Sequence, residues 1–181
     1  LVVLRDPVSR FLSFFNFMKS MQKLNSDMSM SVYLDKCLSL TPQEYNDPRN
    51  NAYFGLQGGN YAEYLDGWVD VFGKNLYVTF FENLTSDPLT FMQSLSNFAG
   101  IDPGPFEGMQ FSRQNVTKGH QNERLHTVAL HCYKRLSPIL NSNLGIKQFF
   151  NSTYNKINGA PINKNRADEA FAIDALSTYY E

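Results

Sequence analysis

The chain opens on a continuous apolar run followed by a helix-start signal. Residues 1–4 are Leu, Val, Val and Leu, a pattern typical of a short strand that is buried on both faces. Arg5 ends that run, and Asp6 and Pro7 come next, which suits a helix start because aspartate is a good N-cap and proline fits the first helical position. The positions that follow predict a helix from Pro7 to about Lys23. A strand, a turn and a helix in this order form the first half of a parallel βαβ unit.

The rest of the chain combines helical periodicity, one further strand and loop signals. We first expect a helix over 29–40, with Val32, Leu34, Leu38 and Leu40 as its apolar set, and then a long surface loop over 41–59. A helix over 60–72 and a strand over 76–81 follow. After them we expect a helix over 88–99 closed by Gly100, an irregular segment over 101–120 and a helix over about 123–141. Beyond Asn151 the chain is rich in Asn, Lys and small residues, and we expect a loosely packed tail with a short helix over 168–179.

Two strands that are each followed by a helix indicate an α/β fold with an open parallel sheet. Such a sheet has more than two strands, because two cannot cover the helices that the pattern predicts. We therefore expect the sheet to be incomplete at its N-terminal side, with further strands upstream of Leu1. The chain begins with a core strand and has no initiator methionine, which indicates a sequence cut from a longer one.

Composition limits how such a fold can act. The chain has 181 residues, the size of a single domain, and 16 Lys and Arg residues against 17 Asp and Glu residues, for a formal net charge of −1. This balance excludes binding to nucleic acid or anionic membranes by bulk charge, so an anionic ligand has to be held by a few local groups. No apolar run approaches the roughly 20 residues of a membrane span. The two cysteines, Cys37 and Cys132, form either one disulfide or two buried thiols, and they do not make a disulfide framework.

The carboxyl end of the first expected strand carries the strongest candidate for a ligand site. In open α/β sheets ligands bind beyond the carboxyl ends of the strands, which is where Arg5 stands. The helix that starts after Asp6 turns its amide hydrogens and the positive end of its dipole toward the same place. Ser13 lies on that helix, and helical side chains lean toward the N-terminus, so an arginine and a hydroxyl group can converge there on a phosphate.

Ser13 also belongs to a stripe of small polar residues along the same helix. At about 100° per residue, Ser9, Ser13, Asn16 and Ser20 fall in a lane roughly 60° wide on an otherwise aromatic helix. Such a lane either lines a wet cleft or is simply the solvent face of the helix.

The residues around this site resemble a known phosphate-binding motif. The segment from Leu4 to Phe15 holds a strand end, Arg-x-Pro, and then Arg10 and Ser13 at set spacing, and it closely resembles the 3′-phosphate-binding motif of sulfotransferases. That family transfers a sulfuryl group from 3′-phosphoadenosine 5′-phosphosulfate (PAPS) to a hydroxyl or amine and leaves 3′-phosphoadenosine 5′-phosphate (PAP). The resemblance implies that Arg5 and Ser13 bind the 3′-phosphate of this co-substrate, and that Arg10 is mainly structural.

The order of the downstream segments strengthens the resemblance. Residues 61–72, 76–81 and 82–88 are similar to the tyrosine–tryptophan helix, the strand and the E-x-L-x-x-D-P turn of the Golgi carbohydrate and heparan sulfate branch of the family. A helix over 88–101 with a Phe-Ala-Gly-Ile end also matches that branch.

A loop near residue 117 provides a second implied nucleotide contact. The run Asn-Val-Thr-Lys-Gly over 115–119 resembles the loop that precedes the last helix of the family, and in relatives a Lys-Gly loop touches the same 3′-phosphate. Lys118 and Gly119 are therefore candidate cofactor-binding residues, and Arg113 is a weaker one.

The resemblance carries expectations about architecture, location and substrate. It implies a three-layer, P-loop-NTPase-like parallel sheet flanked by helices, with a partial sulfotransferase domain over 1–145 and a C-terminal tail over 146–181. It also implies a carbohydrate or another hydroxyl or amine as acceptor, no nucleic acid partner, and a place in the Golgi, with the cytoplasm as the alternative.

The chain departs from the family in the groups that do the chemistry. The family's Gly/Ser/Thr-rich loop for the 5′-phosphosulfate is not in this sequence, and no K-x-G-T-[ST] segment occurs. The catalytic residues are therefore unknown and expected upstream of Leu1, and the isolated 181-residue chain is predicted to be inactive. Two rival readings stay open: a degenerate, non-catalytic binding module, and another nucleotide-dependent transferase of the same fold, such as a kinase.

Several other residues have simpler explanations. His120, His126 and His131 lack the spacing and the partner ligands of a metal site, and are expected to be surface or half-buried histidines. Tyr61, Tyr64 and Trp68 have the spacing of a core helix face, which we prefer to a sugar-stacking platform.

Two further features bear on the acceptor and on glycosylation. The polar and aromatic loop over 45–61 is our candidate for the acceptor-binding wall. Glycosylation sequons occur at Asn83, Asn115 and Asn151, which is close to the number that chance gives in so Asn-rich a chain, so they are no sign of secretion.

Overall fold

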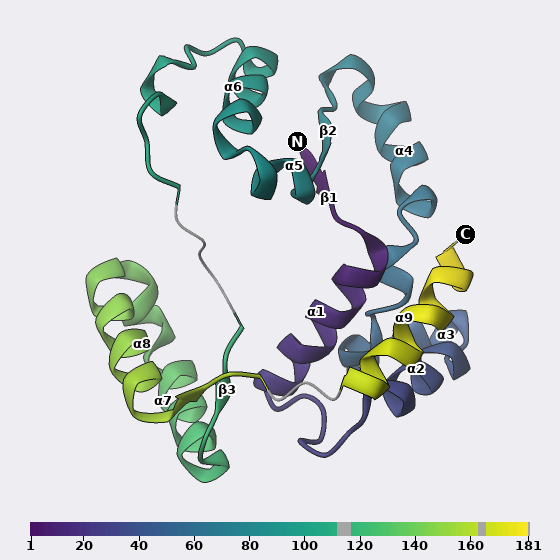
Figure 1. Cartoon of the computed structure of the whole chain (residues 1–181), viewed down its shortest axis with the longest axis vertical. Helices are drawn as coiled ribbons and strands as arrows, with labels where there is room; N and C mark the ends of the chain where they lie inside the picture. The colour runs from purple at the N-terminus through teal and green to yellow at the C-terminus, as the bar shows by residue number, and fades with distance from the viewer. Residues whose placement is uncertain (112–116, 163–165, 181) are drawn as a thin grey trace.

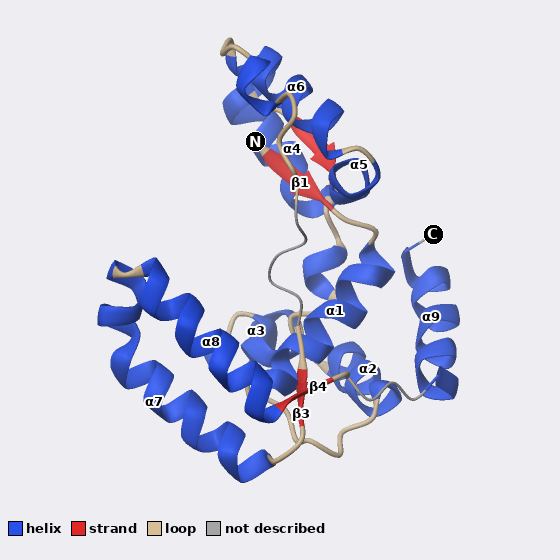
Figure 2. Cartoon of the chain, turned by 60° about the vertical axis from the view of Figure 1, so that its left-hand side comes forward, coloured by secondary structure: helices blue, strands red, loops and turns tan. Residues whose placement is uncertain are grey.

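The structure, a computed structural model, describes residues 1–111, 117–162 and 166–180. Helices dominate these ranges, together with two small two-stranded sheets (Figures 1 and 2). The elements in chain order are β1 (Val2–Leu4), α1 (Pro7–Ser20), α2 (Met30–Ser39), α3 (Pro42–Tyr45), the 3-10 helices η1 (Pro48–Tyr53) and η2 (Gln57–Gly59), α4 (Ala62–Phe72), η3 (Gly73–Asn75), β2 (Val78–Phe80), α5 (Phe81–Ser86), α6 (Pro88–Ala99), η4 (Gly104–Phe106), β3 (Gly119–His120), α7 (Glu123–Ser142), α8 (Leu144–Asn158), β4 (Gly159–Ala160) and α9 (Arg166–Tyr180).

The expected parallel strand pair is present. β1 and β2 pair in parallel, with Leu4 opposite Phe80, and each strand leads into a helix as the α/β pattern predicts. β2 is shorter than the expected strand over 76–81, because β1 has only three residues with which it can form ladder hydrogen bonds. The described residues do not by themselves form the three-layer sheet that the family resemblance implies, since the other sheet is a two-residue antiparallel pair, β3 with β4.

Local capping explains where the predicted helices start and stop. Asp6 caps α1 by accepting a hydrogen bond from the Ser9 amide at 2.7 Å, and Asp87 caps α6 in the same way through Thr90 at 3.0 Å. Gly100 ends α6 in the left-handed conformation, with φ of 69°. α1 ends at Ser20, earlier than predicted, and the chain turns away directly after it.

The core lies where α1, α2 and α9 meet. Phe11 and Phe15 of α1 both pack against the Tyr33 ring of α2, with ring centroids 5.1 and 5.0 Å apart. The fully or nearly buried members of this cluster are Phe11, Phe15, Leu24, Met30, Tyr33, Leu34, Cys37, Leu56, Ala172 and Leu176.

The core face of α2 differs from the predicted one. Val32 and Leu38 are exposed, whereas Met30, Tyr33, Leu34 and Cys37 are buried. The buried residues follow the i, i+3, i+4, i+7 spacing of a single helix face, and Val32 and Leu38 lie outside it. Of the predicted set, Leu34 lies on this buried face, and Leu40, at the C-cap of the helix, is also buried.

The expectation of a loosely packed tail is wrong for α9. Its residues Ala172 and Leu176 have no exposed surface, and the helix lies beside α1 and α2 (Figure 1). Asp168 also accepts hydrogen bonds from the amides of Met30 and Ser31, at 2.5 and 3.0 Å, so α9 supplies a second cap to α2. Burial raises the pKa of Asp168, but these amides and nearby Lys19 outweigh burial and hold it below its ordinary value.

The segment over 41–59 is more ordered than a surface loop. Thr41 and Glu44 form a capping box at α3, and η1 and η2 follow. Tyr53 stacks on Tyr33 at 5.8 Å, and Leu56 is buried in the core. Aromatic and apolar groups within this polar stretch therefore draw it onto the core, which the loop signals alone do not predict.

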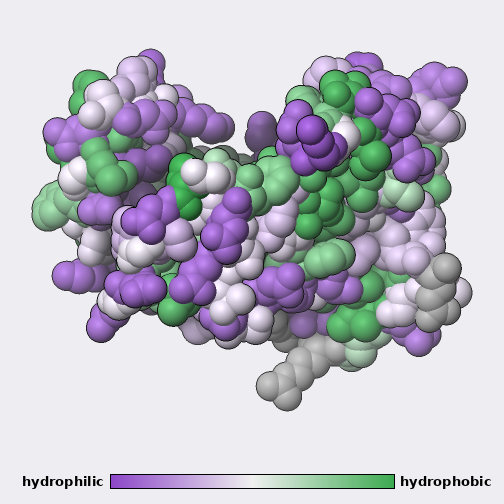
Figure 3. Space-filling model, turned by 90° about the horizontal axis from the view of Figure 1, so that it is seen from above, coloured by the Kyte–Doolittle hydropathy of each residue, from purple (hydrophilic) through white to green (hydrophobic). Residues whose placement is uncertain are grey.

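α4 presents its apolar residues to solvent, contrary to the expected core face. Trp68 is 49% exposed, and Val69, Val71 and Phe72 are more exposed still. Trp68 packs edge-on against Phe72 of its own helix at 6.5 Å. The surface view from above shows apolar side chains at the surface among polar ones (Figure 3). An amphipathic pattern indicates that a helix has an apolar face, but no described element covers this one.

Candidate functional site

Arg5 stands at the carboxyl end of β1, as the sequence predicts. Its backbone carbonyl accepts a hydrogen bond from the Tyr61 hydroxyl at 2.9 Å. Its guanidinium lies over the Phe81 ring, 5.2 Å from the ring centroid, a cation–π contact. The amide of the next residue, Asp6, donates to Glu82 Oε1 at 3.0 Å. The strand end that was predicted to hold an anion is thus built from three segments of the chain.

The start of α1 is a weaker binding site for an anion than the sequence suggests. Pro7 has no amide hydrogen, and the Ser9 amide already donates to the Asp6 carboxylate. Asp6 itself adds a negative charge at this end of the helix. Anion binding here therefore depends on side chains, above all on Arg5.

Ser13 lies in the second turn of α1, on the same stripe as Ser9. It is half-buried, and its hydroxyl has no hydrogen-bond partner among the residues that the structure describes. Ser13 is seven positions after the N-cap Asp6, which is about 10 Å along the helix axis. All four residues of the stripe, Ser9, Ser13, Asn16 and Ser20, are half-buried, so the stripe is not a fully exposed solvent face.

Arg10 is engaged in packing. Its Nη1 donates to the Gly55 carbonyl at 2.9 Å, and its guanidinium lies 5.7 Å from the Phe14 ring centroid. It also fills the space beside Gly58, where a Cβ atom would lie 2.2 Å from the guanidinium nitrogen. The expected structural role of the inner arginine of the motif agrees with these contacts.

Lys118 and Gly119 stand apart from Arg5. Gly119 pairs with Ala160 in the β3–β4 ladder, and the adjacent His120 stacks on His126, which is bonded to the last residue of α1. The 14 residues of α1 span about 21 Å, so Lys118 and Gly119 lie near the end of α1 opposite to Arg5. The structure brings Arg5 and Ser13 onto one strand–helix unit and does not add Lys118 or Gly119 to it. The weaker candidate Arg113 lies outside the described residues.

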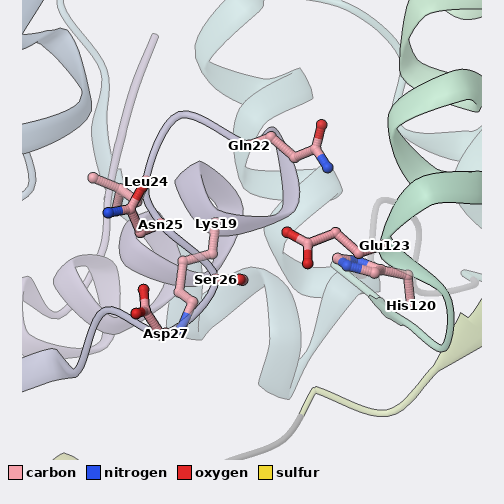
Figure 4. A pocket seen from close by; sticks show the side chains of 8 residues that line it. All are labelled: Lys19, Gln22, Leu24, Asn25, Ser26, Asp27, His120 and Glu123. Carbon is pink, nitrogen blue, oxygen red and sulfur yellow. The ribbon is translucent and has the colours of Figure 1, made fainter.

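A polar hollow of about 470 Å³ occupies that opposite end of α1 (Figure 4). Lys19 and Asp27 line it from the side of α1, and His120 and Glu123 line it from β3 and α7. The Lys19 ammonium donates to the Met28 carbonyl at 2.9 Å. Charges of both signs line this hollow, so it does not select an anion such as a nucleotide phosphate.

His120, which lines the hollow, stacks on His126 behind it. The rings of His120 and His126 lie 4.1 Å apart and almost parallel. His126 is buried, with Nε2 2.6 Å from the Ser20 carbonyl and Nδ1 2.6 Å from the Tyr154 hydroxyl. A carbonyl can only accept, so Nε2 carries a proton. His126, on α7, therefore ties α7 and α8 to the end of α1.

We expect His120 to make stability depend on pH. Burial lowers the pKa of His120, His126 lowers it further, and Glu123 opposes both. The pKa of His120 in the folded chain lies below its unfolded value of about 6.5. The free energy of unfolding should therefore be highest above pH 6.5 and should decrease as the pH falls below that value, because the unfolded chain then binds the proton more readily. Urea denaturation at pH 7.5 and 5.5 should show a smaller pH effect for His120→Gln than for the unchanged chain. His131→Gln, at an exposed position of α7, is the control, and equal pH effects in all three chains would contradict the expectation.

The cysteines are both free, which differs from both sequence alternatives. Cys37 is buried and Cys132 is exposed. Burial raises the pKa of the Cys37 thiol to about 11, and the thiol lies 3.2 Å from the Tyr53 carbonyl. A thiol with such a pKa is protonated at neutral pH and is a poor nucleophile.

The described ranges hold neither a metal-binding cluster nor a membrane-spanning helix. No three His, Cys, Asp or Glu side chains within them lie close enough together to hold a metal ion. No helix within them is long and apolar enough to cross a membrane.

Sequence reasoning missed the residues that surround Arg5. Tyr61 is the N-cap of α4, and Phe81 and Glu82 begin α5 directly after β2. A signal for two of them was available, because the carboxyl ends of neighbouring parallel strands meet at one sheet edge, and Phe81 and Glu82 directly follow the second strand.

Comparisons with known proteins agree with the motif around Arg5. A family model described as the sulfotransferase domain matches residues 1–137. Carbohydrate sulfotransferase 15 of Rattus norvegicus is 33% identical over 113 residues, which cover 57% of this chain and 20% of the relative. The Homo sapiens protein of the same name is 32% identical with the same coverage, so the chain spans about a fifth of the length of these relatives. No solved structure matches. Since the family match extends over most of the chain and includes the strand–helix unit of Arg5 and Ser13, the chain belongs to the sulfotransferase domain family.

Proposed function

We propose that the protein to which this sequence belongs transfers a sulfuryl group from PAPS to a hydroxyl or amine, and that Arg5 and Ser13 bind the 3′-phosphate of this co-substrate. The observation that carries the proposal is the unit of β1 and α1, which lies inside the family match and places Arg5 at the strand end and Ser13 on the following helix. An arginine and a hydroxyl provide charge-assisted hydrogen bonds to a phosphate.

The state of both side chains supports this role. The Arg5 guanidinium faces an aromatic ring rather than a carboxylate, and the Ser13 hydroxyl has no partner in the described part of the chain. Both groups therefore keep donors for a ligand. With a net charge of −1, the chain has no general basic field, so a few local donors must supply the attraction.

The chemistry of the transfer rests on groups that we do not identify. By analogy with phosphoryl transfer, it depends on positioning and on stabilising negative charge in line with the bond that breaks. This sequence holds no match to the 5′-phosphosulfate loop of the family, so we name no catalytic base. Lys118 and Gly119 remain candidate nucleotide contacts, but their place near the far end of α1 leaves the proposal resting on Arg5 and Ser13.

For the acceptor we propose a carbohydrate, and the Golgi as the location that goes with it. The similar proteins are named carbohydrate sulfotransferases. Tyr61, Tyr64 and Trp68 lie on one face of the α4 segment, which starts beside Arg5, and the exposed ring of Trp68 is free to stack on a sugar. Together with the segment over 45–61, this face forms the proposed acceptor wall.

A pair of nucleotides tests the proposed 3′-phosphate site directly. PAP and adenosine 5′-phosphate (AMP) differ only in the 3′-phosphate, and calorimetric titration of the chain with each gives the contribution of that group. Binding is measured rather than turnover, because the loop for the 5′-phosphosulfate has no match in this sequence. PAP should bind much more tightly than AMP.

Equal affinities for the two nucleotides would remove the 3′-phosphate assignment. They would favour the rival readings, a kinase-like transferase or a binding module with another ligand. Neither rival requires a site that distinguishes a 3′-phosphate from a 3′-hydroxyl.

A further inference from the structure

The turn that joins β1 to α1 is held by residues far away in the sequence. The Tyr61 hydroxyl donates to the carbonyl of Arg5 at 2.9 Å, and Glu82 Oε1 accepts from the amide of Asp6 at 3.0 Å. These two bonds hold the two ends of a single peptide unit, the one between Arg5 and Asp6. They fix the plane of that unit and with it the direction in which the Arg5 side chain leaves the backbone.

The parallel register explains why Glu82 meets this turn. Leu4 pairs with Phe80, so the residues that follow the two strands emerge side by side at one sheet edge. Phe81 comes under the Arg5 guanidinium, and Glu82 comes opposite the Asp6 amide. One dipeptide thus contacts both the backbone and the side chain of the phosphate-binding segment.

A carboxylate at this place calls for an explanation. Glu82 is exposed, and it is a negative charge beside a site proposed for a phosphate, where it opposes an anion. Its observed contact is with a backbone amide and not with the Arg5 guanidinium. An acceptor that orders the turn before the ligand arrives would lower the entropy cost of binding, which can outweigh the repulsion.

We infer that Glu82 and Tyr61 are positioning residues for Arg5, which preset this arginine to receive the 3′-phosphate. The inference rests on the proposed function, because it assigns a role in the binding of that phosphate. The inference goes beyond the proposed function because it separates two properties of Glu82. Its hydrogen-bond acceptor favours binding of the phosphate, and its negative charge disfavours that binding.

Two substitutions of Glu82 separate these properties. Glu82→Gln keeps an acceptor oxygen and removes the charge, so the preference for PAP over AMP should stay the same or increase. Glu82→Ala removes both, and the preference should fall by about tenfold, as expected for the loss of one charge-assisted hydrogen bond that orders the site. AMP binding should not change in either variant, which distinguishes positioning from a general loss of structure.

Control variants complete the calorimetric experiment. Glu107→Ala removes an exposed carboxylate from another part of the chain and should leave both affinities unchanged. Tyr61→Phe removes only the hydroxyl that holds the Arg5 carbonyl, and it should lower the PAP preference by a few-fold while AMP binding is retained. This variant carries the test if Glu82→Ala does not fold, which thermal denaturation of each variant shows.

The outcomes keep this inference apart from the proposed function. If the unchanged chain binds PAP and AMP equally, both are overturned. If it prefers PAP and the preference survives in Glu82→Ala and Tyr61→Phe, only the positioning role is overturned. If both Glu82 variants strengthen PAP binding equally, the side chain acts through its charge alone, which also overturns the role.

Discussion

Arg5→Ala is expected to weaken PAP binding by about 2–4 kcal/mol, or roughly 30- to 900-fold, and to leave AMP binding nearly unchanged. The reason is that removing the guanidinium leaves a bound phosphate without its charged partner. The aromatic ring of Phe81, over which the guanidinium lies, cannot take its place. Calorimetric titration of the variant with both nucleotides measures the effect.

The matched control removes the same charge at a distant position. Arg124 is an exposed arginine near the start of α7, at the other end of α1, and Arg124→Ala should change neither affinity by more than about twofold. A loss of PAP binding that equals the loss of AMP binding would show that Arg5 supports the fold or the 5′ end of the nucleotide. No loss at all would remove Arg5 from the site.

Leu176→Ala is expected to lower the free energy of unfolding by about 2–5 kcal/mol, the usual range for a large-to-small change in a packed core. Leu176 has no exposed surface and packs in the cluster formed by α1, α2 and α9. Its truncation leaves a cavity between elements that the chain brings together from its two ends. Urea denaturation followed by circular dichroism measures the change.

A second position on the same helix serves as the control. Ile173 is 41% exposed, so Ile173→Ala should cost clearly less than Leu176→Ala. The two variants lose side chains of similar size and differ mainly in burial. Similar, small costs at both positions would mean that α9 is only loosely attached, as the composition of the C-terminal segment suggests.

Features decided within a few residues were predictable. The N-caps at Asp6 and Asp87, the stop at Gly100 and the strand–turn–helix at the start of the chain all follow from local chemistry. Arg5 and Ser13 were predictable for the same reason, because both belong to one such unit. The positions of Arg5 and Ser13 on this unit are therefore read correctly from the sequence, whereas their role in binding a phosphate stays a prediction.

Features that depend on packing against a distant segment of the chain were predicted poorly. The pattern of α4 indicates an apolar face and led to the expectation of a buried Trp68, but no described element covers it. The tail was expected to be loose because Asn and Lys dominate it, yet the few apolar residues of α9 lie on the face that meets α1 and α2. Composition averages over a segment, whereas packing depends on which face meets a partner.

The sequence by itself determined the β1–α1 unit, the family resemblance and the placement of Arg5 and Ser13, because hydrophobic runs, caps and motif spacing act over short distances. Only the tertiary structure decided that Tyr61 and Glu82 hold the turn at Arg5, that Lys118 and Gly119 lie near the other end of α1, and that α9 completes the core. These features join residues that are tens of positions apart. Their proximity follows from strand register and helix packing, which periodicity along a single chain does not encode.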